Sequence, residues 1–519
     1  MLSVQSRKVL LSPSGLAKRY ARRLLSFEIL LTRLEALRQS ALRPNALAAV
    51  GLLIVLLTFL TWGIPDRQDG LDDAFITFRY AENIANGDGF VFNPGDEAIQ
   101  GTSTPLYTGI LAGGAVLGMD LAILSQIIGT LATAASGVLL VLIGKILRYP
   151  FAGAAAGLLW AGSPFTSEYL SGMETPLYVA LMLSAFLAAF SGSIRLSLTL
   201  SALVALTRLD GLAVLAVVAC YHTLQERRLP AWRELVPALV VLGAWLSYAF
   251  IQFGSPLPAS GVAKLVHGEG VAGGFDVLSE FFMRLAAPFV AFERLTLLGL
   301  GLAVLVAPVA IMRHGPPRRD LGLLGAWLTL YFAGYIILNP PEFAWYYGPP
   351  AVVASFLAWA LFERLAGRAS FVLPALALLI LVFVAIGHRR DAPYDSTYDD
   401  YWVAGAWLRE HSDEDDIIAA YEIGIIGYVS DRKIVDILGL TEPSARPYIA
   451  KGDFGWAVRE LEPDFVFAHA PADWPVTDAI YSVPGFDEAY RLVARYQLVP
   501  RFPALGVADY LLFERRTTE

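Results

Sequence analysis

Long apolar runs recur along this chain and constrain its fold more than any other feature. The first covers residues 46–64, and about 20 apolar helical residues are enough to cross the hydrocarbon core of a bilayer. Of the 519 residues, 56% are hydrophobic and only 17% are charged, whereas a soluble domain has about 25% charged residues. The sequence therefore predicts a polytopic α-helical membrane protein.

Basic residues predict the orientation, because Lys and Arg concentrate in cytoplasmic loops. Residues 1–45 hold nine Lys/Arg against two Glu, and residues 15–42 read as a basic amphipathic helix typical of a cytoplasmic membrane surface. The short, Gly-rich piece 105–118 is treated as a juxtamembrane segment, since counting it as a crossing would move the later basic loops outside. The N-terminus is then cytoplasmic. Eleven spans are predicted, near 46–64, 121–144, 151–166, 174–191, 195–208, 210–224, 235–252, 295–312, 321–338, 348–363 and 371–387.

The pattern changes from about residue 388, where acids outnumber bases roughly two to one. Two short apolar runs, 416–421 and 433–438, flank a Gly-punctuated segment, and helix and strand patterns follow. This favours a soluble α/β domain outside the cytoplasm. The predicted organisation is a cytoplasmic basic segment 1–45, a transmembrane domain 46–387 with its first outer loop at 65–120, and an extracytoplasmic α/β domain 388–519.

The first outer loop carries two adjacent acids, Asp72 and Asp73, in the stretch "GLDDAFITFRYAENIANGDGFVFNPGDE". Neighbouring helical residues are about 100° apart, so the two carboxylates are not expected to clasp one ligand symmetrically. One can act as general base on an acceptor hydroxyl, while the other orients it, holds Arg79 or binds a metal. A solvated helix cap is the plain alternative. The length and order of the loop favour the chemical role.

The longer stretch "LDDAFITFRYAENIANGDGFVFNPGDEAIQGTSTPLYTGILA" resembles the first outer loop of bacterial GT-C fold glycosyltransferases. The nearest branch resembles the mycobacterial terminal arabinofuranosyltransferases and protein mannosyltransferase-like enzymes. Further segments continue the resemblance in order: "SGMETPLYVAL" (171–181), "TRLDGLAVL" (207–215), "FGSPLPASGVAK" (253–264) and "EIGIIGYVSDRKIVDILGL" (422–440).

This resemblance implies an inverting transfer of a sugar from a polyprenyl-phosphate donor, on the outer face of a bacterial cytoplasmic (inner) membrane. It also implies that an outer-loop Asp is the base. Asp72, the leading acid of the motif, is the first candidate and Asp73 the second. The resemblance further implies that the segment "PLYTGILA" is a juxtamembrane helix.

A lipid-phosphate leaving group needs cations nearby. Arg208, which lies with Asp210 between two apolar runs, is one candidate, because the resemblance associates a basic residue in this motif with the donor phosphate. A plain Arg–Asp pair capping a short hairpin is the alternative. Lys264 is the second candidate, with His267 in support, although both suit a solvated loop equally well. Arg79 either serves the donor or pairs with Asp73.

Four further residues are weaker candidates for binding substrate. Glu174 lies at an outer helix start, where an acid also favours the helix dipole. Tyr346 and Tyr347 fall at the outer interface, where an aromatic belt is the default explanation and sugar binding the alternative. Glu342, in the same loop, is a weaker acid.

No required metal or cofactor is expected. The sequence has no His/Cys cluster with zinc spacing, and its one cysteine, Cys220, excludes an intramolecular disulfide. Mg²⁺ or Mn²⁺ held by Asp72, Asp73 and a phosphate is chemically possible, but several GT-C branches resemble metal-independent enzymes. No P-loop or dinucleotide fingerprint supports a nucleotide-driven reaction.

The expected partners are a polyprenyl-phosphate sugar donor, a glycan, lipid or protein acceptor, and the bilayer, with no nucleic acid. The C-terminal domain is expected to bind the acceptor or close over the site, without catalytic residues. A membrane transporter or lipid flippase is the alternative function, although the polar features cluster on the outer side rather than at the membrane midplane. A sensory or assembly protein on an inactive scaffold is the third.

Overall fold

The structure is a computed structural model, and it describes most of the chain. The described residues are 32–62, 70–162, 172–261, 263, 318–338, 340, 343–391, 397–470, 475–497 and 509–516.

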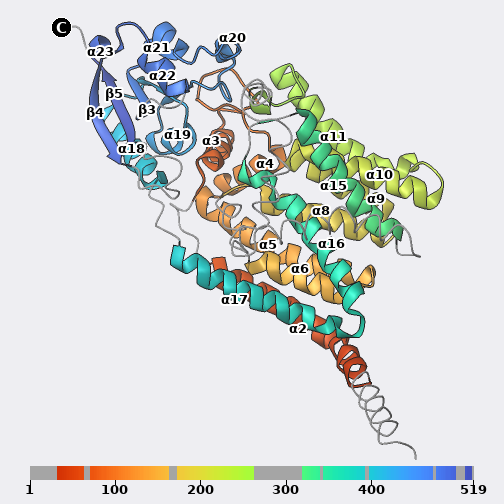
Figure 1. The fold of residues 1–519 in the computed structure, drawn as a ribbon. Coiled ribbons are helices and arrows are strands. Elements are labelled where there is room, and N and C mark those ends of the chain that lie inside the picture. Colours follow the sequence, from red (N-terminus) through yellow and green to blue (C-terminus); the bar gives the residue numbers. More distant parts are fainter. Residues whose placement is uncertain are drawn as a thin grey trace, which may run out of the picture.

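Apolar helices make up the first part of the described structure (Figure 1). They are α2 (Pro44–Trp62), α5 (Leu121–Ile146), α6 (Pro150–Gly162), α8 (Thr175–Phe190), α9 (Ile194–Thr207), α10 (Leu212–Glu226), α11 (Trp232–Phe253), α15 (Arg318–Leu338), α16 (Gly348–Ala366) and α17 (Leu373–Asp391). Among the described residues, five helical stretches are long and apolar enough to cross a membrane. The predicted span 295–312 lies outside the described residues, so the count of eleven stays a prediction.

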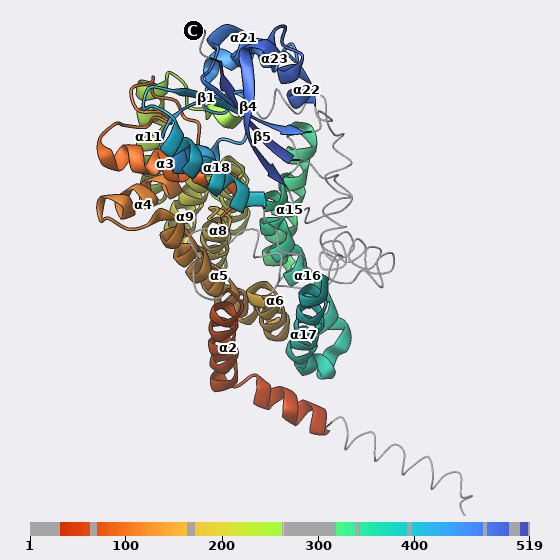
Figure 2. The same cartoon turned by 90° about the vertical axis from the view of Figure 1, so that its left-hand side faces the viewer.

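Small residues let these helices approach closely, as is common inside membranes. A Cβ on Gly153 of α6 would lie 3.0 Å from the Cα of Gly144 on α5, and one on Gly157 would lie 2.5 Å from the carbonyl oxygen of Gly137. Helix α6 also contacts α2 and α17, and Figure 2 shows it between them.

The first outer loop folds into two helices, α3 (Asp72–Asn86) and α4 (Pro105–Val116). They lie between the apolar helices and the C-terminal domain (Figure 1). Helix α3 begins at the acid pair, and ten of its 15 residues are buried. With 12 residues, α4 is shorter than a spanning helix, which agrees with its expected juxtamembrane role.

The C-terminal domain opens with α18 (Thr397–His411) and contains a five-stranded sheet in the order β2-β1-β3-β5-β4. The strands are β1 (Ile417–Ala420), β2 (Lys433–Asp436), β3 (Phe465–Ala470), β4 (Tyr490–Gln497) and β5 (Asp509–Arg515). The two predicted apolar runs become the parallel strands β1 and β2, and the Gly-punctuated segment between them is α19 (Gly424–Ser430).

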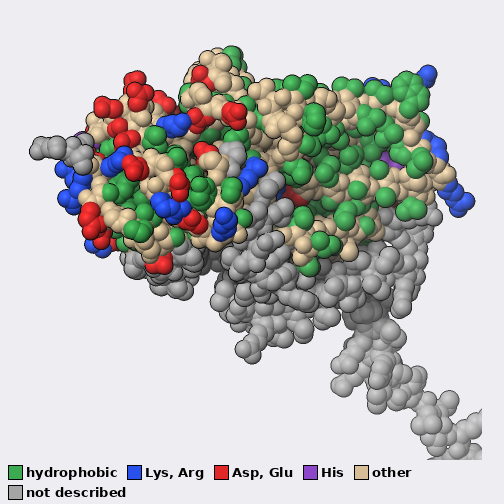
Figure 3. Space-filling view, turned by 90° about the horizontal axis from the view of Figure 1, so that it is seen from above, with side chains coloured by type: hydrophobic (Ala, Val, Ile, Leu, Met, Phe, Trp, Pro, Cys, Tyr) green, Lys and Arg blue, Asp and Glu red, His purple; other side chains and the backbone are tan. Residues whose placement is uncertain are grey.

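Charged side chains gather on the C-terminal domain, while apolar side chains dominate the helical part of the visible face (Figure 3). The helices α20 (Arg446–Ile449), α21 (Trp456–Leu461), α22 (Pro475–Tyr481) and α23 (Phe486–Ala489) complete the domain. The predicted fold class is confirmed: the chain is a helical membrane protein with a C-terminal α/β domain.

Candidate active site

The two acids of the first outer loop occupy the first turn of α3, at the positive end of its dipole. Asp72 is buried, whereas Asp73 is half-buried. One carboxylate oxygen of Asp72 accepts a hydrogen bond from the backbone N–H of Gly424 at 3.0 Å, and the other accepts one from Ile425 at 2.7 Å. Asp72 therefore caps α19 and joins the first outer loop to the C-terminal domain.

Gly424 is required at this joint because of a close approach. A Cβ at this position would overlap the backbone carbonyl oxygen of Asp72. The two helix starts can meet here because Gly424 has no side chain.

Arg79 forms a second clamp between the loop and the C-terminal domain. Its guanidinium donates to the carbonyl oxygens of Phe92 at 2.7 Å and Arg432 at 2.6 Å, to the carbonyl oxygen of Gly427, and to the side-chain oxygen of Asn93 at 3.2 Å. The side chain is 5% exposed. The hydrogen bonds of this guanidinium thus go to Phe92, Asn93, Gly427 and Arg432 and not to Asp73, one of the two roles that the sequence left open; its role toward the donor stays a prediction.

Glu422 is a residue that the sequence reasoning missed. It lies two positions before Gly424, and the charges of Asp72 and Asp73 act on its carboxyl group. Burial, together with these two acids, raises the pKa of Glu422, and burial with the neighbouring Asp73 raises the pKa of Asp72. The position of Glu422 just after β1, at the carboxyl end of a parallel strand, was an available signal, because ligand sites favour that edge.

The Glu422→Gln variant is expected to gain thermal stability over the wild type as the pH rises. Folding raises the pKa of Glu422 from 4.5 to about 8. The folded state therefore binds the proton more tightly, and this contribution is present at low pH and lost as the pH rises toward 8. Melting temperatures measured from pH 4 to 9 should coincide near pH 4, diverge between about pH 4.5 and 8, and stay a constant distance apart above pH 8. Parallel curves would contradict this.

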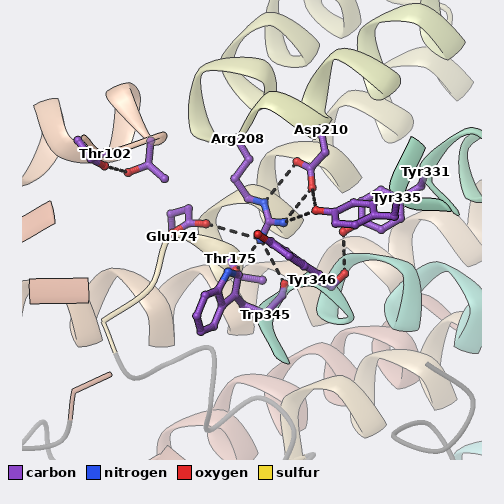
Figure 4. Close-up of polar contacts among 10 residues, drawn as sticks. Thr102, Glu174, Thr175, Arg208, Asp210, Tyr331, Tyr335, Trp345 and Tyr346 are labelled. Carbon is purple, nitrogen blue, oxygen red and sulfur yellow. Dashed lines mark hydrogen bonds and ion pairs between the residues drawn. The ribbon is translucent and has the colours of Figure 1, made fainter. Parts of the chain in front are cut away.

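A second polar cluster surrounds Arg208 at the end of α9 (Figure 4). The guanidinium donates to both carboxylate oxygens of Asp210, at 3.3 and 2.8 Å, and lies 3.6 Å from a carboxylate oxygen of Glu174. It also donates to the Thr175 hydroxyl at 3.2 Å and to the Trp345 carbonyl oxygen at 3.2 Å.

The remaining donor of this guanidinium goes to the Tyr335 hydroxyl at 3.1 Å, and that hydroxyl donates in turn to Asp210 at 2.9 Å. An arginine has five N–H groups, and these five hydrogen bonds occupy all of them. Arg208 therefore binds the start of α8 and the segments before α10 and α16, and so holds them together at one end of the bundle.

Two predicted residues meet Arg208 in this cluster. Glu174 pairs with Arg208, the ring of Tyr346 lies 5.3 Å from the guanidinium carbon, and the backbone oxygen of Tyr346 accepts a hydrogen bond from Tyr331 at 2.6 Å. Tyr347, the residue after Tyr346, is buried at the N-cap of α16. Asp210, which the sequence placed beside Arg208, is the main partner of that arginine.

A short segment connects the two clusters. The Tyr107 hydroxyl donates to the carbonyl oxygen of Gly172 at 2.9 Å, and a Cβ at Gly172 would lie 2.9 Å from the Cβ of Ala74, the residue after Asp73. Two residues later, Glu174 reaches Arg208. The acid pair and the arginine cluster thus lie at the same end of the bundle.

Some predicted residues are outside the described part of the chain, namely Lys264, His267 and Glu342. Among the described residues, no set of three His, Cys, Asp or Glu is arranged to hold a metal ion. Whether the protein needs a metal stays a prediction.

Comparisons with known proteins identify the fold. A domain of unknown function (DUF8728) matches residues 390–514. The comparison with curated proteins finds no match. Among solved structures, ArnT from Cupriavidus metallidurans bound to undecaprenyl phosphate is similar, with 12% identity, a TM-score of 0.54, and coverage of 89% of this chain and 97% of that one.

The apo oligosaccharyltransferase of Archaeoglobus fulgidus is also similar, with 14% identity, a TM-score of 0.52, and coverage of 88% of this chain and 74% of that one. At these identities the likeness shows a shared fold, which agrees with the GT-C fold expected from the sequence. The resemblance to the arabinofuranosyl and mannosyl branch is not confirmed by these neighbours.

Proposed function

We propose that the protein is an inverting glycosyltransferase that moves a sugar from a polyprenyl-phosphate donor to an acceptor on the outer face of a bacterial cytoplasmic membrane. The single observation that carries this proposal is the acid pair at the start of α3, held where the ends of the helices and the C-terminal domain meet. The GT-C fold supports it, as does the undecaprenyl phosphate bound to one structural neighbour.

In the proposed reaction, an acceptor hydroxyl gives its proton to a carboxylate as its oxygen attacks the anomeric carbon. The bond between that carbon and the phosphate oxygen breaks, and polyprenyl phosphate leaves with the electron pair. The configuration at the anomeric carbon is inverted. A positioned base contributes about 10²–10⁴-fold to such a step.

Asp73 is the better candidate for the base. Both carboxylate oxygens of Asp72 already accept backbone hydrogen bonds from α19, and its side chain is buried. Asp73 is half-buried, one position further round the helix. This supports reversing the order that the motif alone favours, with Asp72 as a positioning residue.

The donor phosphate is assigned first to Lys264, with His267 in support, because a leaving phosphate needs cations nearby. Both residues lie outside the described part of the chain. Arg208 becomes a positioning residue, because its N–H groups bond to the protein. Arg79 is left out of the substrate site for the same reason. The proposed reaction requires no metal.

The experiment that tests this function is transfer of a labelled sugar from polyprenyl phosphate by the reconstituted protein. Acceptor-linked product is expected, together with loss of the donor. Movement of labelled lipid across the membrane without transfer would favour the transporter or flippase instead. A periplasmic reporter fused after residue 391 should be active if the C-terminal domain lies outside.

The Arg208→Lys variant is expected to fold and to transfer slowly. Lysine keeps the positive charge between Glu174 and Asp210, but it loses the planar fork that binds both oxygens of Asp210. A misplaced site can lower the rate about 10²-fold. The measurement is kcat and the melting temperature together, and an unchanged kcat would show that the clasp does not position the site.

A further inference from the structure

A row of uncharged polar side chains lies along the face of α3 that begins at Asp73. Asp73, Thr77 and Tyr80 share this face, because residues three and four apart are neighbours on a helix. The Tyr80 hydroxyl accepts a hydrogen bond from the backbone N–H of Gly101 at 3.1 Å, and the Thr77 hydroxyl bonds to that of Thr102 at 3.1 Å. The segment 100–104 therefore runs antiparallel to α3 here: Gly101 lies at Tyr80, and Thr102 lies at Thr77, one turn nearer Asp73.

Among the described residues, the hydroxyls of Thr77, Thr102 and Thr104 carry one more hydrogen than the hydrogen bonds between them use. Thr102 and Thr104 are hydrogen-bonded to each other at 2.9 Å, and Thr102 also bonds to Thr77. Three hydroxyls carry three donor hydrogens, and these two bonds use two of them. All three residues are at least nine-tenths buried.

The far end of the row holds two polar atoms without partners. Within the described part of the chain, the side-chain oxygens of Gln100 and Ser260 are buried and form no hydrogen bond. Gln100 is 3% exposed and Ser260 is 6% exposed. Their two chain segments lie side by side, because the backbone N–H of Ala259, next to Ser260, donates to the Gln100 carbonyl oxygen at 2.8 Å. Buried polar atoms left unpaired destabilise a fold, so such atoms call for an explanation.

We propose that the acceptor is a saccharide, and that Gln100, Ser260 and the hydroxyls of Thr102 and Thr104 bind its hydroxyl groups while its reacting hydroxyl lies at Asp73. This inference rests on the proposed function. Every group in the row is neutral, which suits a neutral ligand rich in hydroxyls; a phosphate would need cations, and an acyl chain would need an apolar surface. From Asp73 to Tyr80 the helix rises about 10 Å, which is longer than one sugar ring.

The test uses Gln100→Leu and Ser260→Ala in the full-length reconstituted protein. Each substitution removes an unpaired buried atom, so the melting temperature should stay the same or rise. The KM for a saccharide acceptor should rise about tenfold, the cost of one lost hydrogen bond to the substrate, while the KM for the donor stays constant. A purely structural role predicts the reverse, with a lower melting temperature and no selective change in the acceptor KM.

The matched control is Thr108→Val, at a buried hydroxyl that bonds to the Thr104 backbone oxygen at 3.0 Å. It should leave the acceptor KM unchanged. The probes are polyprenyl-phosphate mannose and arabinose as donors. The acceptors are linear trisaccharides of mannose and arabinofuranose, an unglycosylated peptide and a sugar-free lipid.

Each outcome decides the proposal. Transfer to a trisaccharide that weakens selectively in Gln100→Leu and Ser260→Ala supports it. Transfer by the wild type to the peptide or the bare lipid alone overturns the saccharide assignment and leaves the proposed function standing. An unchanged acceptor KM in both variants does the same. If neither donor is consumed with any acceptor, both proposals fail together.

Discussion

Replacing Asp73 with asparagine is expected to reduce transfer by about 10²–10⁴-fold, because an amide cannot take the proton from the acceptor hydroxyl. The fold should survive. The backbone hydrogen bonds that join α3 to α19 go to Asp72, and the asparagine side chain keeps the shape of the aspartate. Initial rates with a labelled polyprenyl-phosphate sugar, measured beside the melting temperature, give the result.

Two further variants serve as controls for this experiment. Asp88→Asn removes an exposed acid from the same outer loop and should retain full activity. Asp72→Asn should lower the melting temperature as well as the rate, since an amide has one oxygen where the carboxylate uses two. If Asp73→Asn keeps its full rate while Asp72→Asn loses activity without losing stability, Asp72 is the base.

Replacing Arg79 with Met should cost about 3–5 kcal/mol of stability, since it leaves several buried oxygens without a donor. The loss should concentrate at the joint, because Gly427 and Arg432 belong to the C-terminal domain and Phe92 and Asn93 to the first outer loop. Thermal melting of the purified protein and limited proteolysis between the two domains are the measurements. The released C-terminal fragment is expected in the variant only.

Arg459→Met is the matched control for that experiment. Arg459 is an arginine of the same domain, with a side chain 42% exposed, paired with Asp453 at 2.8 Å. A surface pair contributes about 0–1 kcal/mol, so this variant should melt close to the wild type. An equal effect of the two substitutions would show that the Arg79 clamp does not hold the domains together.

The Asp73→Asn and Arg79→Met variants test two different things. The first tests the proposed chemistry, and the second tests how the first outer loop and the C-terminal domain are held together. Asp73 is proposed to act on the substrate, whereas Asp72, Arg79 and Gly424 fix where Asp73 stands. The C-terminal domain therefore contributes to the site through the backbone of α19 and through Glu422. The sequence predicted no catalytic residue in that domain, and we propose that it supports the site through these contacts.

Arg208 shows how much of a residue's role its type and sequence position can predict. Its place between two apolar runs predicted a special role, and the structure confirms that it is buried. Its partners come from segments more than 30 and 120 positions away, Thr175 and Tyr335. No local sequence pattern shows that all of its N–H groups donate to protein oxygens, and the sequence therefore favoured a phosphate ligand.

The sequence by itself determined that this chain is a membrane protein of many helices with a C-terminal α/β domain, because hydrophobic length and period are local properties of the chain. It also located the acid pair at the start of the first outer loop. Only the tertiary structure decided that Asp72 caps α19, because α19 begins some 350 residues after Asp72 and the two meet through backbone N–H groups that no residue type encodes. Contacts of that kind depend on how the elements pack.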